Sequence, residues 1–453
     1  MFLKSKENNY KFFKLRPVQI LALGFAALIL LGAILLTLPI SSRNGDVTSF
    51  LDALFTATSA TCVTGLVVVD TGTHWSTFGQ VVIISLIQIG GLGFMTFSTL
   101  IAIILGKRVS LKERLIIQEA YNAFSIQGIV KLVIYILIIT LTIEGIGAII
   151  LTTQFLKDYS IGTSIYYGIF HSISSFCNAG FDLLGDFKGY TGYVTNSIVS
   201  LTVAALIVLG GIGFLVIAEV IGHKRRRKYT LHTKVVIITT AFLIILGAVL
   251  MFAFEYNNPK TMGNLSIIDK IVASIFASVT PRTAGANTIS TGDMTIAGQF
   301  LTIILMFIGA SPGSTGGGIK TTTMMILFMT IMCIINGRDD TEIFRKRINK
   351  YSVYRAVSIT LISFMLVIVV TMILSITEKG TFIQFLYEAT SAFGTVGLTL
   401  GLTPTLTPIG KIAIIITMYA GRLGPLTLVL AFAYKQKTTN TTIKYPEDKI
   451  LVG

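Results

Sequence analysis

Eight apolar stretches dominate this chain, and each is long enough to cross a lipid bilayer as a helix. They lie near residues 17–38, 78–105, 131–152, 194–221, 233–254, 296–335, 353–376 and 408–433. A helix needs roughly 20 apolar residues to span the ~30 Å of hydrocarbon in a bilayer. With 53% hydrophobic and 13% charged residues, the chain of 453 residues has far more apolar sequence than one soluble core requires. The sequence therefore predicts an all-helical, multi-pass integral membrane protein.

Basic residues gather in alternate loops, and this pattern predicts how the chain is oriented. Clusters follow the second, fourth and sixth apolar stretches (GKRVSLKER, HKRRRKYTLHTK and GRDDTEIFRKRINKYSVYR), and both ends of the chain are basic. Loops on the other side of the membrane carry fewer Lys and Arg. By the positive-inside rule, both termini are expected in the cytoplasm. The basic residues behind the net charge of +15 are thus interpreted as setting the orientation of the chain in the lipid bilayer. No nucleic acid partner is expected.

A short segment that recurs between paired apolar stretches indicates internal repeats. The four segments are SFLDALFTATSATCVTGLVV, SIYYGIFHSISSFCNAGFDL, IDKIVASIFASVTPRTAGANT and FIQFLYEATSAFGTVGLTLG. Aligned on one glycine, they end in C-V-T-Gly65, C-N-A-Gly180, R-T-A-Gly285 and G-T-V-Gly397. We call these the loop glycines. Six positions before them stand Ser59, Ser174, Val279 and Ser391.

A second glycine marker follows each loop glycine, inside the next apolar stretch. It occurs as IGGLGF at Gly90, LGGIGF at Gly210, IGASPG at Gly309 and AGRLGP at Gly421, after 25, 30, 24 and 24 residues. We call these the helix glycines and expect them mainly to allow close helix packing. Two markers in the same order predict four tandem copies of helix, re-entrant half-helix and helix. The expected boundaries are 1–110, 111–230, 231–350 and 351–453.

Four re-entrant loops at membrane depth are best explained by a pore. Irregular backbone is tolerated there only where it lines water or is buried in protein. Four half-helices around one pseudo-fourfold axis would direct backbone carbonyls and helix dipoles towards a cation and replace its hydration shell. Glycine permits the backbone angles that carbonyls facing one axis require. The loop glycines therefore predict a cation pathway.

The sixth apolar stretch is interrupted by GASPGSTGGGIKTTT, residues Gly309–Thr323, which we call the break segment. A nucleotide-binding P-loop is disfavoured, because Ile319 separates Gly318 from Lys320 and the flanks are apolar. The remaining interpretations are a fixed kink and a flexible gate that crosses the pore. Lys320 either faces the pore or extends to the cytosolic boundary.

Arg422 is a second cation within an apolar stretch. It forms either a buried ion pair, with an acid such as Glu388, or a barrier in the permeation path.

The four loops, the break segment and Arg422 in AGRLGP resemble the Ktr/Trk/HKT superfamily of potassium transporters over almost the whole chain. Eight stretches without a further N-terminal helix pair resemble membrane subunits of the KtrB or KtrD type more than TrkH. The resemblance implies potassium uptake at a bacterial plasma membrane, often influenced by sodium. It also implies a homodimer with one pore per subunit and a cytosolic nucleotide-binding ring of the KtrA or KtrC type. No organic cofactor is implied on this chain.

The repeats and the resemblance together give the candidate site. The predicted selectivity filter comprises Cys62, Val63, Thr64, Gly65, Cys177, Asn178, Ala179, Gly180, Thr283, Ala284, Gly285, Gly394, Thr395, Val396 and Gly397. Potassium is expected at the carbonyl groups of Gly65, Gly180, Gly285 and Gly397. The predicted gate comprises Gly309, Ala310, Ser311, Pro312, Gly313, Ser314, Thr315, Gly316, Gly317, Gly318, Lys320 and Arg422. Because only glycine recurs in every copy, we expect potassium selectivity to be less stringent than with four identical loops.

Two other functional classes stay open at this point. A secondary transporter with alternating access also uses repeats and broken helices, although its repeats are often inverted, whereas these four share one orientation. An intramembrane enzyme would have to use His171 or Cys177, and the sequence has no paired nucleophile, base or metal set for either. We therefore expect no enzymatic activity.

Overall fold

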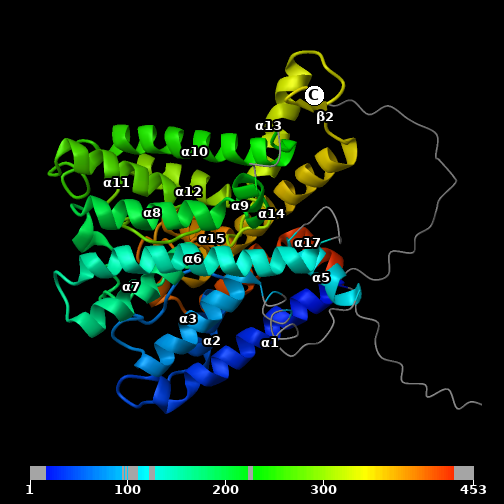
Figure 1. Ribbon diagram of the computed structural model, residues 1–453. Helices are drawn as coiled ribbons and strands as arrows, with labels where there is room; N and C mark the ends of the chain where they lie inside the picture. The colour runs from blue at the N-terminus through cyan, green and yellow to red at the C-terminus, as the bar shows by residue number, and fades with distance from the viewer. Residues whose placement is uncertain are drawn as a thin grey trace, which may run out of the picture.

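The computed structural model describes residues 17–93, Thr96, Thr99 and residues 111–121, 128–222 and 228–432, and these residues are mostly helical (Figure 1). The predicted basic ends of the chain and most of HKRRRK lie outside the described residues. The helices are α1 (Pro17–Thr37), α2 (Phe50–Thr61), α3 (Thr77–Leu92), α5 (Leu111–Tyr121), α6 (Ile129–Phe155), α7 (Ile161–Phe176), α8 (Ser197–Gly211), α9 (Phe214–Ile221), α10 (Leu231–Glu255), α11 (Ile267–Val279), α12 (Ile296–Phe307), α13 (Thr321–Ile335), α14 (Lys350–Thr377), α15 (Phe382–Gly394), α16 (Pro408–Leu423) and α17 (Pro425–Phe432). Short 3-10 turns occur at Pro39–Ser41, Thr191–Tyr193 and Thr403–Thr405.

Long apolar helices agree with a multi-pass membrane protein, but not every predicted stretch is one continuous helix. Among the described residues, α1, α6, α10 and α14 are long and apolar enough to span a membrane, and α8 with α9 makes a fifth candidate. The pair α8 and α9 is bent by 99° at Gly213, whose φ is +98°. Gly424, with φ +87°, likewise separates α16 from α17. A residue in this region of φ cannot continue a right-handed helix, so the expectation of continuous helices over 194–221 and 408–433 was wrong.

The four short segments predicted as half-helices are confirmed as helices α2, α7, α11 and α15. Each packs against the long helix before it: α2 on α1, α7 on α6, α11 on α10 and α15 on α14 (Figure 1). Each ends shortly before its loop glycine, so the loop glycine always follows the C-terminal end of a helix. The partial negative charge of a helix C-terminus is thereby directed at each loop.

In the third and fourth copies, polar side chains join the long helix before the half-helix to the helix that follows the loop. Glu255, at the end of α10, accepts hydrogen bonds from the amide (2.9 Å) and the hydroxyl (2.7 Å) of Thr295, the N-cap of α12. Glu378, the C-cap of α14, accepts the same two bonds from Thr407, the N-cap of α16, at 3.0 and 2.5 Å. These bonds satisfy helix-end amides that would otherwise lack partners.

The helix glycines allow neighbouring backbone to pack closely against their helices, as the sequence suggested. In three copies a carbonyl group from the end of the half-helix lies where a Cβ would stand: Thr61 against Gly90, Phe176 against Gly210 and Phe393 against Gly421. In the third copy, Gly309 instead lies against the carbonyl of Gly317 in the break segment. The third copy therefore differs from the others where its second helix is broken.

The two largest clusters of buried side chains flank the loops. The larger joins the first two copies and includes Phe155 and Phe176. The second joins the fourth copy to the first and includes Phe55, Phe393 and Ile414. The loops are thus supported by packed side chains rather than by solvent-exposed turns.

A small β-hairpin, β1 (Glu342–Ile343) and β2 (Lys346–Arg347), connects α13 to α14. Figure 1 shows α13 and this hairpin projecting from the bundle at the end opposite the half-helices. On α13 only Thr321 and Cys333 are buried, although the helix is strongly apolar.

Candidate functional site

The four loop glycines contact one another in a closed cyclic order. All have a positive φ: +92°, +70°, +71° and +93° for Gly65, Gly180, Gly285 and Gly397. A Cβ on each would collide with the backbone of the next loop: Gly65 with Ala179, Gly180 with Ala284, Gly285 with Val396, and Gly397 with Thr64. Both the backbone angle and the lack of space therefore require glycine in every copy.

The residue two positions before each loop glycine is also left-handed, which the sequence did not indicate. These residues are Val63, Asn178, Thr283 and Thr395, with φ of 58°, 61°, 83° and 50°. Asparagine tolerates this region, but β-branched residues with positive φ are rare and strained. Strain of this kind persists where surrounding structure holds it, and often lies at functional sites. The only available signal was Asn178, in one copy of four.

Hydroxyl groups brace the loops from the half-helices. Ser59 and Ser391 accept hydrogen bonds from the amides of Gly65 and Gly397, at 3.0 and 3.1 Å.

In the other two copies the hydroxyl acts as a donor. Ser174 donates to the carbonyl of Phe181 at 2.6 Å. In the third copy the corresponding position is Val279, and the neighbouring Thr280 donates to the carbonyl of Ala286.

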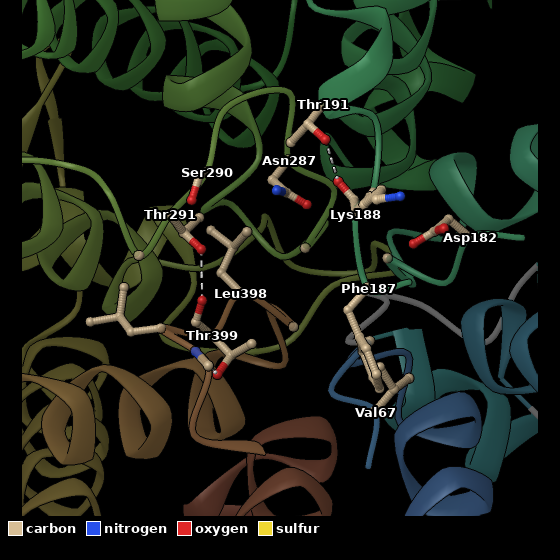
Figure 2. A pocket seen from close by; sticks show the side chains of 18 of the residues that line it. Val67, Asp182, Phe187, Lys188, Thr191, Asn287, Ser290, Thr291, Leu398 and Thr399 are labelled. Atoms are coloured by element: carbon tan, nitrogen blue, oxygen red, sulfur yellow. Dashed lines mark hydrogen bonds between the residues drawn. The ribbon is translucent and has the colours of Figure 1, made fainter. Parts of the chain in front are cut away.

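A cavity of about 470 Å³ opens on one side of the loop glycines, all four of which line it. We name this cavity the outer cavity, and Figure 2 shows around it the four residues that stand two positions after the loop glycines: Val67, Asp182, Asn287 and Thr399. Among these four, Asp182 carries the carboxylate. Burial and the nearby Asp70 raise the pKa of Asp182 to about 6.

Two buried polar residues, at the same position in different copies, hold the segments that border the outer cavity. His171 and Glu388 each stand nine residues before their loop glycine. His171 Nε2 accepts a hydrogen bond from the amide of Leu183 at 3.2 Å. Glu388 accepts one from the Thr399 hydroxyl at 2.7 Å and another from Thr403. Glu388 is therefore bound within its own copy rather than serving as the suggested partner of Arg422.

The break segment passes beneath the loops and touches three of them. The amide of Gly317 donates to Thr395 Oγ1 at 3.0 Å, and Thr315 Oγ1 donates to the carbonyl of Phe176 at 3.4 Å. A Cβ on Gly316 would collide with the side chain of Thr283. Residues of the second, third and fourth copies therefore meet at this segment.

Neighbouring groups satisfy several of the polar atoms that the helix break frees. Ser311 and Thr321 hydroxyls are hydrogen-bonded at 2.9 Å, and the Ser314 hydroxyl donates to the Ser311 carbonyl at 2.6 Å. The amide of Phe214, at the start of α9, donates to the carbonyl of Gly313 at 2.9 Å. Glycines with positive φ at 313 and 318 allow the chain to turn twice within the segment.

Arg422 and Lys320 hold this segment from the side away from the loop glycines. Arg422 donates to the carbonyls of Thr315 and Gly90, and to that of Gly91 at 3.0 Å. Lys320 Nζ donates to the carbonyl of Gly316 at 2.7 Å, so Lys320 turns inwards. The guanidinium thereby ties the break segment to the C-terminal end of α3.

An inner cavity of about 140 Å³ lies on this side of the break segment. It is lined by Gly313, Ser314, Gly316, Gly318, Lys320 and Arg422, together with Glu119 of α5 and parts of α1 and α3. The break segment therefore borders the inner cavity, and the loop glycines border the outer one.

The predicted site residues come together in space, although they are scattered along the chain. Apart from Gly394, the last residue of α15, the predicted filter residues lie in the four loops, and the predicted gate residues lie in the break segment and on α16. Among the described residues, no group of three His, Cys, Asp or Glu side chains could hold a metal ion.

Comparison with known proteins gives a consistent result. The TrkH family, described as "Cation transport protein", matches residues 2–442. The chain is 44% identical over 448 residues to the Ktr system potassium uptake protein B of Bacillus subtilis, covering 99% of both chains. It is also 44% identical over 444 residues to the potassium/sodium uptake protein NtpJ of Enterococcus hirae, covering 97% of this chain and 98% of the relative.

The fold also has a solved counterpart. The crystal structure of the potassium transporter TrkH from Vibrio parahaemolyticus superposes with a TM-score of 0.73 at 18% sequence identity. The match covers 95% of this chain and 87% of that one. With the family match over nearly the whole chain and the apolar helices, it follows that this multi-pass membrane protein belongs to the TrkH family of cation transport proteins.

Proposed function

We propose that this protein takes up potassium through a channel-like pore formed by its four copies, with the four loop glycines as the selective layer. The relatives named for potassium uptake support the choice of ion. The copies are assigned to residues 1–110, 111–230, 231–350 and 351–453. The carbonyl groups of Gly65, Gly180, Gly285 and Gly397 would replace the hydration shell of the ion.

One observation carries this proposal: the cyclic contact of the loop glycines. Each glycine abuts the next loop, and the last abuts the first, so four backbone segments surround one centre. The outer cavity ends at these glycines, and the C-terminal ends of four half-helices are directed at them. Oriented carbonyls and helix dipoles stabilise a dehydrated cation at such a centre.

The break segment is proposed as the gate. It lies between the loops and the inner cavity, where Arg422 and Lys320 hold its carbonyl groups. Two cations on this path would also repel a permeating potassium ion. Opening would require Arg422 to exchange its bonds to Thr315 and Gly90 for others.

Ion coupling, assembly and orientation complete the proposal. The name of the Enterococcus relative includes sodium, which supports sodium as a coupling, activating or second transported ion. We propose a homodimer at a bacterial plasma membrane with cytoplasmic termini, as the basic loops indicate. A cytosolic nucleotide-binding ring of the KtrA or KtrC type would regulate the gate, because Ktr relatives are named as members of a system.

Transport is tested by rubidium influx into proteoliposomes and by growth of a potassium-uptake-deficient bacterium at low potassium. Both are expected with the wild-type protein, with potassium competing for rubidium better than sodium does. Protein that is present in the membrane but supports neither influx nor growth would rule out the proposed function and favour another transported ion.

The gate is tested by removing Gly313 to Gly317. Influx is expected to become high without the nucleotide-binding ring and to lose most of its response to nucleotide, because the barrier has lost the residues that cross beneath the loops. Influx that stays low in a folded, dimeric variant would mean that the break is a fixed kink.

The variant Arg422→Gln tests whether Arg422 is a barrier to ion flow or mainly stabilises the fold. If the guanidinium holds the gate closed, rubidium influx rises and the melting temperature in detergent changes little. A lower melting temperature without added influx would indicate that Arg422 mainly stabilises the packing of three copies through its bonds to backbone carbonyls.

A further inference from the structure

A buried carboxylate lies inside the membrane helix α6, behind the second loop. Glu144 is 5% exposed and stands in the middle of a helix of 27 residues. Its Oε2 accepts a hydrogen bond from Gln88 Nε2 of α3 at 3.1 Å. Charged residues are costly at such a position and are usually kept for a function.

The same carboxylate reaches a residue of the predicted filter. Cys177 is fully buried, and its Sγ lies 3.8 Å from Glu144 Oε1 and 3.5 Å from Gln88 Oε1. Both oxygens are acceptors, so the thiol donates to one of them. Cys177 begins the loop three residues before Gly180, and its side chain faces Glu144 and Gln88 behind the loop.

Further contacts restrict the thiol and the helices that hold it. A Cβ on Gly91 would lie 2.8 Å from Cys177 Sγ, so α3 leaves no free space behind the loop. The hydroxyl of Ser172, on α7, donates to the carbonyl of Glu144 at 2.6 Å. Helices α3, α6 and α7 therefore meet at this cluster and share its hydrogen bonds.

We propose that Glu144 is a positioning residue for ion selectivity, acting through Cys177 on the second loop. With Gln88 it fixes the start of the loop, and thereby the direction of the carbonyl groups from Asn178 to Gly180. This inference rests on the proposed filter function of the loop glycines.

Physical reasons favour a carboxylate at this position. The two oxygens of this carboxyl group accept from two donors, the Gln88 amide and the Cys177 thiol, and such hydrogen bonds are stronger in a low dielectric than in water. The second loop turns through two left-handed residues, Asn178 and Gly180, and contacts from outside the loop help to keep it in one conformation. Without the carboxylate the loop gains freedom, so its carbonyl groups also accept the smaller sodium ion.

The test compares two variants: the single variant Glu144→Gln, and a double variant that carries both Gln88→Glu and Glu144→Gln. The single variant keeps the shape but replaces one carboxyl oxygen by an amide nitrogen, so either the Gln88 amide or the Cys177 thiol loses its acceptor. The double variant restores one carboxylate and one amide beside the thiol, in exchanged places. The ratio of rubidium to sodium influx is expected to fall about tenfold in Glu144→Gln, equivalent to about 1.4 kcal/mol. In the double variant most of this ratio should return.

Glu255→Gln is the matched control, because Glu255 is an equally buried carboxylate at the outer end of a long helix. It is expected to lower the melting temperature and leave the influx ratio unchanged. A second readout, the rise in melting temperature caused by potassium relative to sodium, reports ion binding without transport. In Glu144→Gln this difference should shrink.

The outcomes separate the two proposals. An unchanged influx ratio and an unchanged potassium-specific thermal shift in Glu144→Gln overturn the positioning role while leaving the transport proposal intact. An equal loss in Glu255→Gln, or a double variant as impaired as the single one, also overturns it. Wild-type protein with a potassium-specific thermal shift but no influx refutes the proposed transport, and the thermal shift of the variants still decides the role of Glu144.

Discussion

The loops of the first and fourth copies differ from those of the second and third in how they are held. In the former pair a serine accepts the amide hydrogen of the loop glycine, and the glycine φ is +92° or +93°. In the latter pair a hydroxyl donates to the carbonyl just after the glycine, and φ is +70° or +71°. The four loops therefore form two structural pairs.

This difference shows that residues at the same position in two copies can have different roles. Ser59 and Ser174 occupy the same position in their copies, yet the first accepts a hydrogen bond and the second donates one. A ring made of two kinds of loop has two kinds of carbonyl environment. The pairing predicts unequal effects for substitutions that look equivalent in the sequence.

Replacing the loop glycines by alanine should have the largest effect. Every alanine would collide with the next loop, so all four variants should lose most discrimination against sodium. Gly65→Ala and Gly397→Ala should lose more than Gly180→Ala and Gly285→Ala. A φ near +70° borders the left-handed region that alanine can enter for ~1–2 kcal/mol, whereas +92° lies outside it.

Rubidium and sodium influx measured side by side would rank the four glycine variants. Wild-type selectivity in all four would disprove the filter assignment. Equal losses in all four would show that the collision, and not the backbone angle, determines the effect.

Removing the bracing hydroxyls should have an intermediate effect. Ser391→Ala leaves the buried amide of Gly397 without its partner, which costs about 1–3 kcal/mol. Ser174→Ala leaves the carbonyl of Phe181 without its hydrogen-bond donor, and buried carbonyls tolerate a missing bond better than amides do. Potassium selectivity and the melting temperature should therefore fall more in Ser391→Ala. The reverse order would show that the two pairs of loops are not distinguished by these bonds.

Acidification should have the smallest effect, acting through the one copy with a carboxylate beside the outer cavity. Because burial and Asp70 raise the pKa of Asp182 to about 6, its negative charge is present above that pH and is lost below it. At subsaturating potassium, uptake should fall roughly two- to threefold between pH 7 and pH 5 as the attraction to cations disappears. Asp182→Asn should show reduced uptake at pH 7 and little further change on acidification; a full pH response in this variant would assign the titration to another group.

The parts predicted well from the sequence depend on patterns that recur in every copy. The half-helices, the loop glycines and the packing role of Gly90, Gly210 and Gly421 all follow from repeated spacing. The bends at Gly213 and Gly424 were missed, although the recurrence of a second glycine three positions after the helix glycine was visible.

Other features depend on contacts between distant segments, so no local pattern reveals them. The left-handed angle of Val63 contradicts its residue type and is imposed by the surrounding fold. The bond of Arg422 to Thr315 joins residues from different copies, whereas the sequence offered Glu388 as an example of an ion-pair partner beside the alternative of a barrier. Glu144 is a lone acid within an apolar stretch, which by itself indicates a functional residue, but its contact with Cys177 is visible only in the structure.

The contact between Gly397 and the loop of Gly65 has a consequence for biosynthesis. The first of these loops leaves the ribosome long before the last, so it must wait in the membrane for the partner that covers its backbone. Contacts between residues so far apart in the chain form slowly, because the entropy of closing a long loop is lost before any contact compensates for it. A chain that stalls before its fourth copy would expose three loops with unpaired polar groups to lipid, which makes such an intermediate a natural target for membrane quality control.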